Sequence, residues 1–370
     1  MSSDRIRVGI IGVGWGSIVL APAFRAVPEF EVAAICSRRP ERVAEAGEKL
    51  GVEDTSTDWE SFVRRDDLDL IAVCTPTDLH HEQTIGALRA GKHVLCEKPA
   101  AVNSAQAKSM LDVAEQSGVA HAVNFEGRWL ADRLPVWDLV DDGYLGRPYL
   151  ARVTTVGDLW HPSRRLQSEW MYRVEDGGGY LMGLSSHDID FLTALFGEPE
   201  AVCADVKTSV PTRAREDGSV LEVTADDTST VLMRMKSGVS VSVSSSMVGL
   251  HVDRRVLEAY GSDGTIEITS TLMGGERDSA IRAAKVNESG LQDVALSSRR
   301  PRSGVEIPAR RAGSAILALS LMLEDWLPAF DGKPAPRVPT LRNGWITQAV
   351  VDAARRSSAG EGWVDLALDQ

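Results

Sequence analysis

Short apolar runs alternate with helix-like segments over the first 125 residues, and this alternation limits the possible folds more than any other feature. Five runs predict strands, at Ile6–Ile11, Phe30–Cys36, Leu68–Cys74, His93–Cys96 and Val119–Phe125. The segments between them predict helices near 17–27, 40–50, 58–65, 79–90 and 103–117. Nearly continuous apolar runs are typical of parallel strands that are covered on both faces. The alternation therefore predicts a doubly wound parallel sheet in an N-terminal domain, residues 1–125.

The pattern changes after residue 125. Helices are expected near 131–142 and 184–196, and strands at 147–157, 200–209, 227–236, 238–248, 253–260 and 264–269. Segment 272–312 is polar and lacks periodicity, so we expect irregular excursions there. The terminal helices, 314–330 and 341–357, have no obvious strand partners. These features predict a second domain, residues 126–370, with a largely antiparallel sheet.

Composition excludes several classes of protein. The chain has 370 residues, with 43% hydrophobic, 25% charged and a net charge of −13, which argues against a nucleic-acid partner. The N-terminus runs directly into a strand-like segment, without a charged-then-apolar leader. The longest apolar helix candidate, Ala315–Leu323, is interrupted by Ser320, so no membrane span is expected. The cysteines form no Cys-x-x-Cys pair, which favours reduced thiols in a cytoplasmic protein: Cys36, Cys74, Cys96 and Cys203.

A glycine-rich loop follows the first predicted strand and opens a helix. Gly12 and Gly14 fit the first two positions of a dinucleotide fingerprint. Gly12 allows the tight turn, and Gly14 lets the backbone approach a pyrophosphate at the helix N-terminus. The third position is Ser17, which is small enough for close helix–strand packing, and an extra glycine stands at Gly16. We therefore predict a nucleotide site that includes Gly12, Gly14, Trp15 and Gly16.

The residues after the second predicted strand bear on the choice of cofactor. An NAD enzyme usually carries an acidic residue about 20 residues past the glycines. This chain has Ser37 there, followed by Arg38 and Arg39. A hydroxyl with a guanidinium suits a 2′-phosphate, and the alternative is that the arginines are solvated loop residues. We expect NADP as the cofactor, with NAD possible.

Two further strand ends carry polar residues. Thr75-Pro76 closes the run Leu68–Cys74 and precedes His80, at the crevice edge where this fold holds the ribose and nicotinamide. His80, His81 and Glu82 superficially look like metal ligands, but adjacent helical residues face different directions, so no metal is expected.

The stretch from Gly91 to Pro99 is the most informative part of the chain. An apolar strand ends abruptly in Glu97, Lys98 and Pro99. Pro99 favours an extended Lys98, and a lysine at the carboxyl end of a strand points into the ligand-binding crevice of an open α/β sheet. We expect Glu97 and Lys98 beside the cofactor, with Glu97 holding Lys98 or the local backbone.

These motifs together resemble the Gfo/Idh/MocA family, which is named for glucose–fructose oxidoreductase, inositol dehydrogenase and a rhizopine catabolism protein. The resemblance covers nearly the whole chain and rests on Gly12-Val13-Gly14, Thr75-Pro76 with His80, Gly91 to Pro99, Asn124 to Arg128, Gly143 to Gly146, Gly177-Gly178-Gly179, and His187 with Asp190. It implies a Rossmann domain followed by a C-terminal α/β domain with a large, mostly antiparallel open sheet, which forms a homodimer or homotetramer contact. It also implies NAD(P)-dependent chemistry on sugars, cyclitols and related polyols.

The resemblance also implies catalytic residues. The family's lysine corresponds to Lys98, whose ammonium can stabilise alkoxide charge, and its histidine corresponds to His187, a group suited to acid–base work. Many members carry an aspartate four residues before this histidine, where this chain has Gly183. His187 could therefore instead be a helix-start histidine bonded to backbone. Asp190, three residues on, shares its helix face and serves either the substrate pocket or the helix itself.

Substrate residues follow from the same resemblance. Asn124 and Arg128 come after the last Rossmann strand, and Arg128 could bind substrate or join the two domains by a salt bridge. Trp170 and Arg173 belong to an aromatic segment, with Trp160, His161 and Tyr172, that could line a sugar pocket or simply pack. The leading hypothesis is an oxidoreductase acting on a sugar-like polyol. The alternative is a non-catalytic NAD(P)-binding sensor of the same fold, which Gly183 keeps open.

Overall fold

A computed structural model describes residues 5–272, 278–307 and 312–368. The chain forms two compact units, one from residues 1–129 with 299–345 and the other from 130–298 with 346–370. The chain therefore passes between the units three times. The predicted division of the domains after residue 125 stays a prediction.

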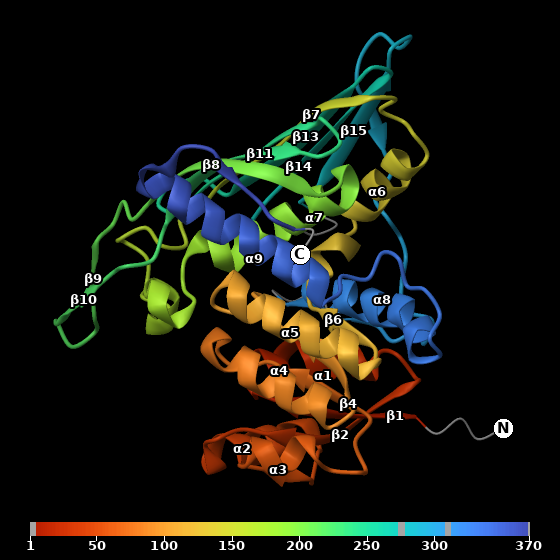
Figure 1. The fold of residues 1–370 in the computed structure, drawn as a ribbon, viewed down its shortest axis with the longest axis vertical. Coiled ribbons are helices and arrows are strands. Elements are labelled where there is room, and N and C mark those ends of the chain that lie inside the picture. The colour runs from red at the N-terminus through yellow and green to blue at the C-terminus, as the bar shows by residue number, and fades with distance from the viewer. Residues whose placement is uncertain (1–4, 273–277, 308–311, 369–370) are drawn as a thin grey trace. The chain divides into compact units, whose positions relative to one another are not determined.

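The first unit contains a six-stranded parallel sheet (Figure 1). Its strands are β1 (Ile6–Ile11), β2 (Phe30–Cys36), β3 (Thr55–Ser56), β4 (Leu70–Val73), β5 (His93–Cys96) and β6 (His121–Val123). Their order is β3-β2-β1-β4-β5-β6, so the direction of winding reverses between β1 and β4. Ligands bind at this kind of switch point, outside the carboxyl ends of the strands. The predicted Rossmann sheet is confirmed, with β3 as a strand that the sequence pattern missed.

The helices of this unit agree with the predicted segments. They are α1 (Ala21–Arg25), α2 (Pro40–Leu50), α3 (Trp59–Val63), α4 (His80–Arg89) and α5 (Ser104–Ser117), with a π-helical turn, η1 (Gly16–Leu20), before α1. Local capping explains several boundaries. Asp58 accepts hydrogen bonds from the Glu60 and Ser61 amides at the start of α3, and Gly51 ends α2 in the left-handed region.

Helix α8 (Gly313–Phe330) also belongs to the first unit. Its Ser320 hydroxyl donates to the Ala23 carbonyl, and its Phe330 ring meets the edges of Phe30 and His93. Among the described residues it alone is long and apolar enough to cross a membrane, by length and composition only. Half of its window is buried inside the structure, and core helices often pass this test, so the finding is weak evidence for a membrane span.

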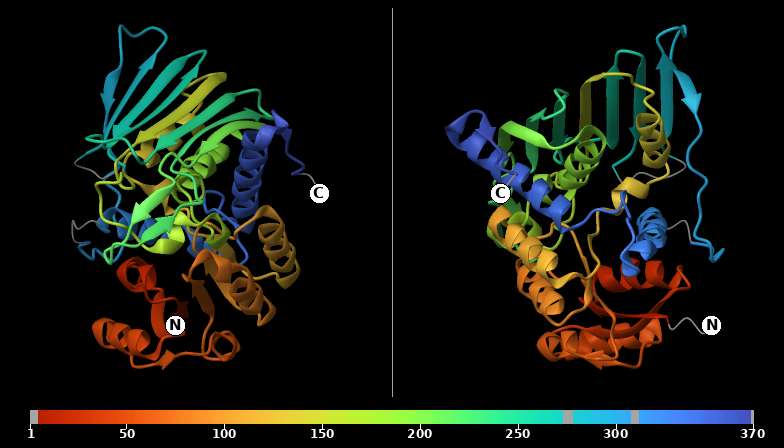
Figure 2. Two further views of the ribbon diagram at one scale, coloured as in Figure 1. Left: turned by 90° about the vertical axis from the view of Figure 1, so that its left-hand side faces the viewer. Right: turned by 45° about the vertical axis from the view of Figure 1, so that its right-hand side comes forward.

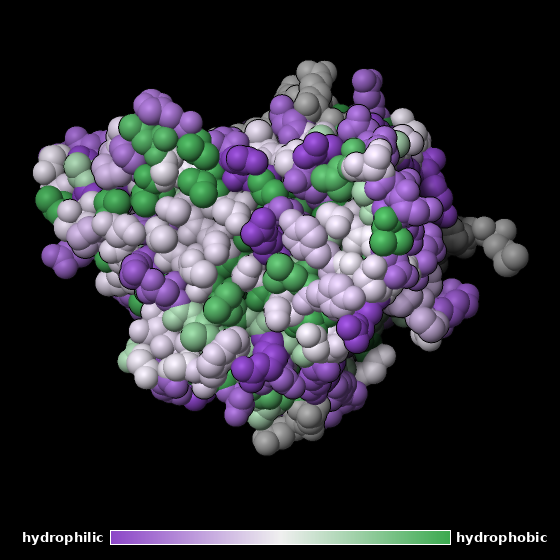
Figure 3. All heavy atoms as spheres, turned by 90° about the horizontal axis from the view of Figure 1, so that it is seen from above, coloured by the Kyte–Doolittle hydropathy of each residue, from purple (hydrophilic) through white to green (hydrophobic). Residues whose placement is uncertain are grey.

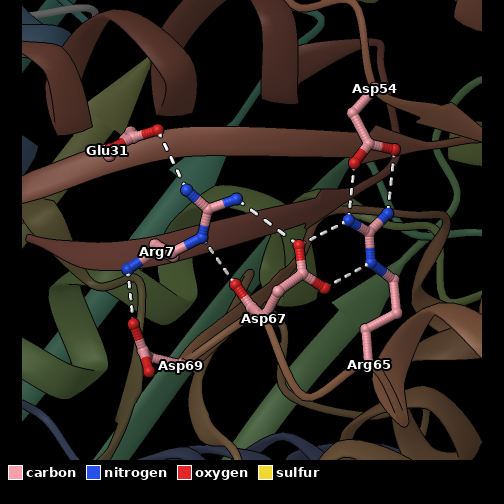
Figure 4. A network of polar contacts seen from close by, with 6 residues as sticks. All are labelled: Arg7, Glu31, Asp54, Arg65, Asp67 and Asp69. Atoms are coloured by element: carbon pink, nitrogen blue, oxygen red, sulfur yellow. Dashed lines mark hydrogen bonds and ion pairs between the residues drawn. The ribbon is translucent and has the colours of Figure 1, made fainter.

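An ion-pair network joins the amino ends of β1 and β2 to the loops beside them (Figure 4). It consists of Arg7, Glu31, Asp54, Arg65, Asp67 and Asp69. The Arg65 guanidinium holds both oxygens of Asp54, at 2.8 and 2.5 Å, and both of Asp67, at 2.9 and 2.7 Å. Hydrogen bonds from Arg65 lower the pKa of Asp54 and lower that of Asp67 to about 2.

The second unit is built on a nine-stranded sheet. Its strands are β7 (Pro148–Val156), β8 (Pro199–Lys207), β11 (Thr228–Met235), β12 (Ser240–Ser246), β13 (Arg254–Gly261), β14 (Gly264–Ser270), β15 (Ala280–Lys285), β16 (Gln292–Val294) and β17 (Val364–Asp365). Their order is β16-β15-β14-β13-β7-β12-β11-β8-β17, and every pairing except β7 with β12 is antiparallel. The predicted large, mostly antiparallel sheet is confirmed.

Two parts of the sequence prediction for this unit were wrong or incomplete. Segment 272–312 is not wholly irregular, because it contains β15 and β16, and residues 273–277 and 308–311 lie outside the described part. The period-two alternation of β15 spans only six residues, and β16 only three. A separate two-stranded hairpin, β9 (Thr212–Ala214) with β10 (Val220–Glu222), was not predicted.

One face of the nine-stranded sheet carries helices. Alternate residues of β11 are buried, and Figure 2 shows α7 (Ser186–Phe196) and α9 (Leu341–Arg356) on the same side of the sheet. The Ser357 and Ser358 hydroxyls after α9 accept hydrogen bonds from amides of β8, which ties this end of the chain to the sheet. Helix α6 (Arg133–Asp141) occupies the predicted segment near 131–142.

The opposite face of this sheet is open. In Figure 3 the surface seen from above the sheet is mostly pale and weakly polar, with separate hydrophobic patches. A row of paired residues crosses six strands there: Leu232, Ser242, Arg152, Glu258, Glu267 and Arg282. Arg152 with Glu258 and Arg282 with Glu267 form cross-strand ion pairs.

Candidate functional site

The glycine-rich loop lies at the switch point between β1 and β4. Gly12 has φ +104°, and a Cβ added there would lie 2.2 Å from the Cys74 carbonyl oxygen. The loop is therefore pressed against β4, and only glycine fits at position 12. A Cβ added to Gly14, by contrast, would have no heavy atom within 4 Å, so the backbone there is open to a ligand.

The close helix–strand packing falls on Gly16 rather than Ser17. A Cβ on Gly16 would lie 3.0 Å from Ile10 Cγ2, so the extra glycine does what the third fingerprint glycine normally does. The Ser17 hydroxyl oxygen is buried and has no hydrogen-bond partner within the described ranges. Trp15 is 39% exposed beside this loop. The open backbone at Gly14 can approach a dinucleotide pyrophosphate, and the buried Ser17 hydroxyl can donate a hydrogen bond to it.

The end of β2 presents two arginines to solvent. The Ser37 amide donates to the Ser56 carbonyl in β3, and the side chains of Arg38 and Arg39 are exposed. In the part of the chain that the structure describes, neither arginine side chain has a hydrogen bond or ion pair. Their guanidinium groups are therefore available to a phosphate near the end of β2.

His80 joins the loop after β4 to the loop after β5. Its ring is 1% exposed, with Nε2 at 2.8 Å from the Thr75 carbonyl and Nδ1 at 2.8 Å from the Pro99 carbonyl. Burial lowers the pKa of His80. Both ring nitrogens thus contact backbone carbonyls, so His80 connects the loop after β4 to the loop after β5. The Thr75 hydroxyl donates to Gln83 at 2.7 Å, and Pro76 ends the loop before η2 (Thr77–Leu79).

Glu97 is a buried carboxyl group at the end of β5. Its Oε2 accepts the Lys98 amide at 3.1 Å, and its Oε1 accepts the Asn124 side-chain amide at 2.5 Å. Burial raises the pKa of Glu97, while Lys98 and Asn124 act in the opposite direction. Lys98 is half-buried, and the peptide bond between Lys98 and Pro99 is cis. The expectation that Glu97 holds the backbone of Lys98 agrees with these contacts.

Asn124 and Arg128 follow β6. Asn124 is fully buried, and its Oδ1 has no hydrogen-bond partner among the residues that are described. Arg128 is also buried, and it donates to the Arg337 carbonyl at 2.9 Å within the same unit. The strand ends of the first unit thus bring the glycine loop and Lys98 close to Cys74, whose thiol pKa is raised by burial, and Asn124 contacts Glu97 beside them.

In the second unit, a triple glycine leads into the helix that carries His187. Gly177 and Gly179 have φ +79° and +112°, and a Cβ on Gly179 would lie within van der Waals overlap of Asp226 Oδ1. Asp226 accepts the Leu181 amide at 2.7 Å and so caps the helix, although burial raises its pKa. The first turn, η6 (Leu181–Ser185), is π-helical, and α7 continues from it. Asp226 is a residue that the sequence did not single out.

His187 is half-buried in the first turn of α7, which is the predicted helix-start position. Its backbone carbonyl accepts from Arg133 at 3.3 Å. Arg133 and Arg255 both bind Asp188 Oδ1, and all three side chains are largely buried. Asp190 is 1% exposed, which fits a role inside the helix packing. The arginine–aspartate cluster was not found from sequence, because its members come from α6, α7 and β13.

The aromatic segment divides between core and surface. Trp160 and Tyr172 are buried in a cluster with Tyr180, with ring centroids 5.0 Å apart for the first pair. Buried Arg213 donates to the Trp160 and Arg164 carbonyls and lies over the Tyr172 ring. Trp160 and Tyr172 thus pack, whereas Trp170 is 37% exposed and Arg173 is half-exposed near Glu169. No group of three potential metal-ligating His, Cys, Asp or Glu side chains occurs in the described residues.

Comparisons with known proteins bear on this arrangement. Residues 6–125 match the oxidoreductase family with an NAD-binding Rossmann fold, and residues 135–267 match the GFO/IDH/MocA C-terminal domain. The chain belongs to the Gfo/Idh/MocA family. The family, the fold class and the NAD(P)-dependent oxidoreductase class predicted from sequence are confirmed.

Individual relatives extend along nearly the whole chain. A levoglucosan dehydrogenase of Pseudarthrobacter phenanthrenivorans is 26% identical over 98% of each protein, and a myo-inositol 2-dehydrogenase of Thermotoga maritima is 27% identical over 85% of this chain and 94% of that one. A solved structure of levoglucosan dehydrogenase in complex with NADH matches with a TM-score of 0.86 at 26% identity, covering 98% of this chain and 99% of that one.

Proposed function

We propose that this Gfo/Idh/MocA oxidoreductase transfers hydride between a nicotinamide cofactor and a secondary alcohol or ketone of a ring sugar or cyclitol. The observation that carries the proposal is the half-buried Lys98 after β5, beside the β1–β4 switch point where this fold binds its cofactor. Relatives that act on levoglucosan and myo-inositol support a polyol substrate.

The cofactor is held by residues of the first unit. Gly12 and Gly16 shape the loop, and the open backbone at Gly14 with the Ser17 hydroxyl receives the pyrophosphate. Arg38 favours NADP, since its exposed guanidinium can pair with a 2′-phosphate. Trp15, Ser37, Thr75 and Pro76 are the proposed contacts of the ribose and nicotinamide, and His80 supports the Thr75 backbone through its 2.8 Å contact.

Catalysis needs a group that stabilises developing alkoxide charge and a group that moves the hydroxyl proton. When bound, the nicotinamide accepts or supplies the hydride. Lys98 stabilises the oxygen of the reacting carbinol, and Glu97 orients the Lys98 backbone through the 3.1 Å hydrogen bond. His187 takes up or returns the hydroxyl proton. Asn124, Arg128, Trp170 and Arg173 are the proposed substrate residues, whereas the burial of Asp190 favours a role in the helix packing over the substrate role predicted from the sequence.

Replacing Lys98 tests the assignment. We expect Lys98→Met to lower kcat by about 10²–10³-fold, as removal of an oxyanion donor does, while the Kd for NADPH stays within twofold. Lys92→Met, in the turn before β5, is a matched control that removes an ammonium nearby in sequence and should retain full turnover. Unchanged kcat in Lys98→Met would contradict the assignment.

The alternative function is a non-catalytic NAD(P)-binding sensor, which a binding and turnover experiment can test. It is favoured by Gly183, which stands where the family resemblance predicts an aspartate. Stoichiometric NADPH binding with no turnover across a panel of sugars, cyclitols and keto-sugars, each tried with NAD and NADP, would support the sensor.

We also propose that the protein is cytoplasmic and assembles as a homodimer or homotetramer through the open face of the nine-stranded sheet. The row of Arg152, Glu258, Glu267 and Arg282 carries both signs of charge, so two copies related by a two-fold axis can pair it with itself. Light scattering of Glu258→Arg and of the restored double variant Arg152→Glu/Glu258→Arg tests this. A monomeric wild-type protein at micromolar concentration would refute it.

A further inference from the structure

Glu97 carries a buried carboxyl group whose titration has no part in orienting the Lys98 backbone. The side chain is 6% exposed, so water stabilises its negative charge poorly. The two hydrogen bonds that it accepts, from the Lys98 amide at 3.1 Å and from the Asn124 side chain at 2.5 Å, favour the carboxylate instead. Burial and hydrogen bonding therefore oppose each other, and a further charge nearby can decide whether Glu97 is protonated.

Asn124 can accompany Glu97 in both protonation states. It is fully buried, its Nδ2 donates to Glu97 Oε1, and its own Oδ1 has no hydrogen-bond partner within the described ranges. A protonated carboxyl group donates an O–H, so it needs an acceptor where the carboxylate needs a donor. A half-turn of the Asn124 amide exchanges Nδ2 for Oδ1 and supplies that acceptor without movement of the backbone. The contact between the two side chains can thus be kept whether Glu97 is charged or neutral.

Three other titratable groups near Glu97 stay neutral around pH 7. Burial raises the pKa of the Cys74 thiol after β4, and it raises that of the Cys96 thiol in β5 to about 12. Burial lowers the pKa of His80, whose ring joins the neighbouring loops. Lys98 is the charged neighbour, and its positive charge favours the carboxylate form of Glu97. Among these groups, Glu97 is therefore the one expected to change its charge.

Glu97 also lies close to the switch point where this fold binds its cofactor. Its amide donates to the Val73 carbonyl at the end of β4, and β4 pairs with β1, which leads into the glycine loop. Neighbouring strands lie about 4.8 Å apart, so the end of β5 is roughly 10 Å from the end of β1. Opposite unit charges at about that distance shift a pKa by about one unit when the effective dielectric constant is near 20. The positive charge of an oxidised nicotinamide ring is therefore large enough to change the protonation of Glu97.

We propose that Glu97 binds a proton in step with the redox state of the cofactor, as a carboxylate with the oxidised nicotinamide and as a carboxylic acid with the reduced one. Oxidation of a carbinol transfers a hydride to the ring and releases the hydroxyl proton. The balanced change converts one carbinol, one oxidised cofactor and one Glu97 carboxylate into one ketone, one reduced cofactor and one Glu97 carboxylic acid. The net charge at these strand ends then stays constant. The inference rests on the cofactor site of the proposed function and needs no assumption about the substrate.

The test measures the Kd of NADP⁺ and of NADPH between about pH 5.5 and 8.5, by the fluorescence of bound NADPH and its displacement by NADP⁺. Both forms carry the 2′-phosphate, so its titration near pH 6 cancels in the ratio of the two constants. In the wild-type protein, the Kd of NADP⁺ divided by that of NADPH should fall about tenfold as the pH rises, because only the Glu97 carboxylate attracts the positive ring. Glu97→Gln should make this ratio independent of pH. Glu82→Gln, which removes an exposed carboxylate from α4, is the matched control and should retain the fall.

A second measurement does not depend on the folding of a variant. At the pH where the wild-type ratio is halfway through its fall, the infrared difference spectrum of the NADPH complex minus the NADP⁺ complex should show the carbonyl stretch of a newly protonated carboxyl group. The absence of this band, a wild-type ratio that does not change with pH, or a fall that persists in Glu97→Gln overturns the inference.

These outcomes are separate from a failure of the proposed function. A protein that binds NADP⁺ and NADPH but turns over no polyol overturns the proposed activity, and the pH dependence of the two Kd values still decides the role of Glu97. A protein that binds neither form overturns the cofactor site and this inference together.

Discussion

His80 should contribute to the stability of the first unit out of proportion to its size. Both ring nitrogens lie 2.8 Å from backbone carbonyls, of Thr75 on one side and Pro99 on the other, and the ring is 1% exposed. A neutral imidazole has one N–H, so it donates to one of the two carbonyls at a time. The ring nevertheless keeps both loops in place by filling the space between them.

The cost of removing these contacts can be worked from the geometry. One buried hydrogen bond contributes about 1 kcal/mol net, and a buried carbonyl left without a partner costs about 1–3 kcal/mol. His80→Phe, which keeps a ring in the space, should therefore lower the free energy of unfolding by about 2–4 kcal/mol. His80→Ala should cost more, because it also leaves a cavity.

Urea unfolding, followed by circular dichroism and by NADPH fluorescence, measures both the stability and the cofactor site. His81→Ala is a matched control, since the His81 ring is only partly buried and its side-chain hydrogen bond within the described residues, with Ser109, is 3.4 Å long. The control should stay within about 0.5 kcal/mol of wild type. A His80→Phe protein with an unchanged urea midpoint and slope would refute the clamping role. Loss of NADPH affinity at low urea is expected, because the Thr75 and Pro99 loops then move independently.

Four more substitutions, one of them a control, test other parts of the structure. Gly12→Ala should cost about 1–3 kcal/mol from its positive φ, and more from overlap with the Cys74 carbonyl, measured by urea unfolding; wild-type stability would contradict the loop geometry. Asp188→Ala should cost about 3–5 kcal/mol because it strands two buried arginines, whereas Arg152→Ala on the open face should cost under about 1 kcal/mol. Arg65→Gln should cost about 1 kcal/mol at pH 7, since its carboxylate partners are exposed. Because the pKa of Asp67 is lowered to about 2, this difference should be complete above pH 4 and vanish as the pH falls through 2, and a pH-independent difference would argue against the network.

The elements that the sequence predicted well are those with a strong local signal. The strands β1 and β5 were predicted to the residue, because continuous apolar runs end there in glycine or charged residues. For the second unit, the family resemblance added the prediction of a large open sheet, which agrees with the nine-stranded sheet. Short strands such as β3 and β16 carry too few residues for a period to be visible.

The parts that sequence reasoning missed depend on contacts between distant segments. Gly16 rather than Ser17 packs against β1, which only the position of Ile10 reveals. The carboxylate of Asp226 caps a helix 45 residues earlier in the chain. His80 was expected beside the cofactor because of its place in the motif. Its ring contacts two backbone carbonyls, and a sequence pattern does not show where backbone carbonyls lie.

The packing of α8 onto the first unit affects how the protein is made. Ser320 and Phe330 contact Ala23, Phe30 and His93, but the ribosome adds them 197 and 207 residues after Val123, the end of β6. At about 5–20 residues per second, translation of residues 130–345 takes roughly 10–45 s. During that time the nascent nucleotide-binding sheet lacks its α8 cover. Its apolar side is therefore available to chaperones, and a fragment that stops after residue 129 should bind them persistently.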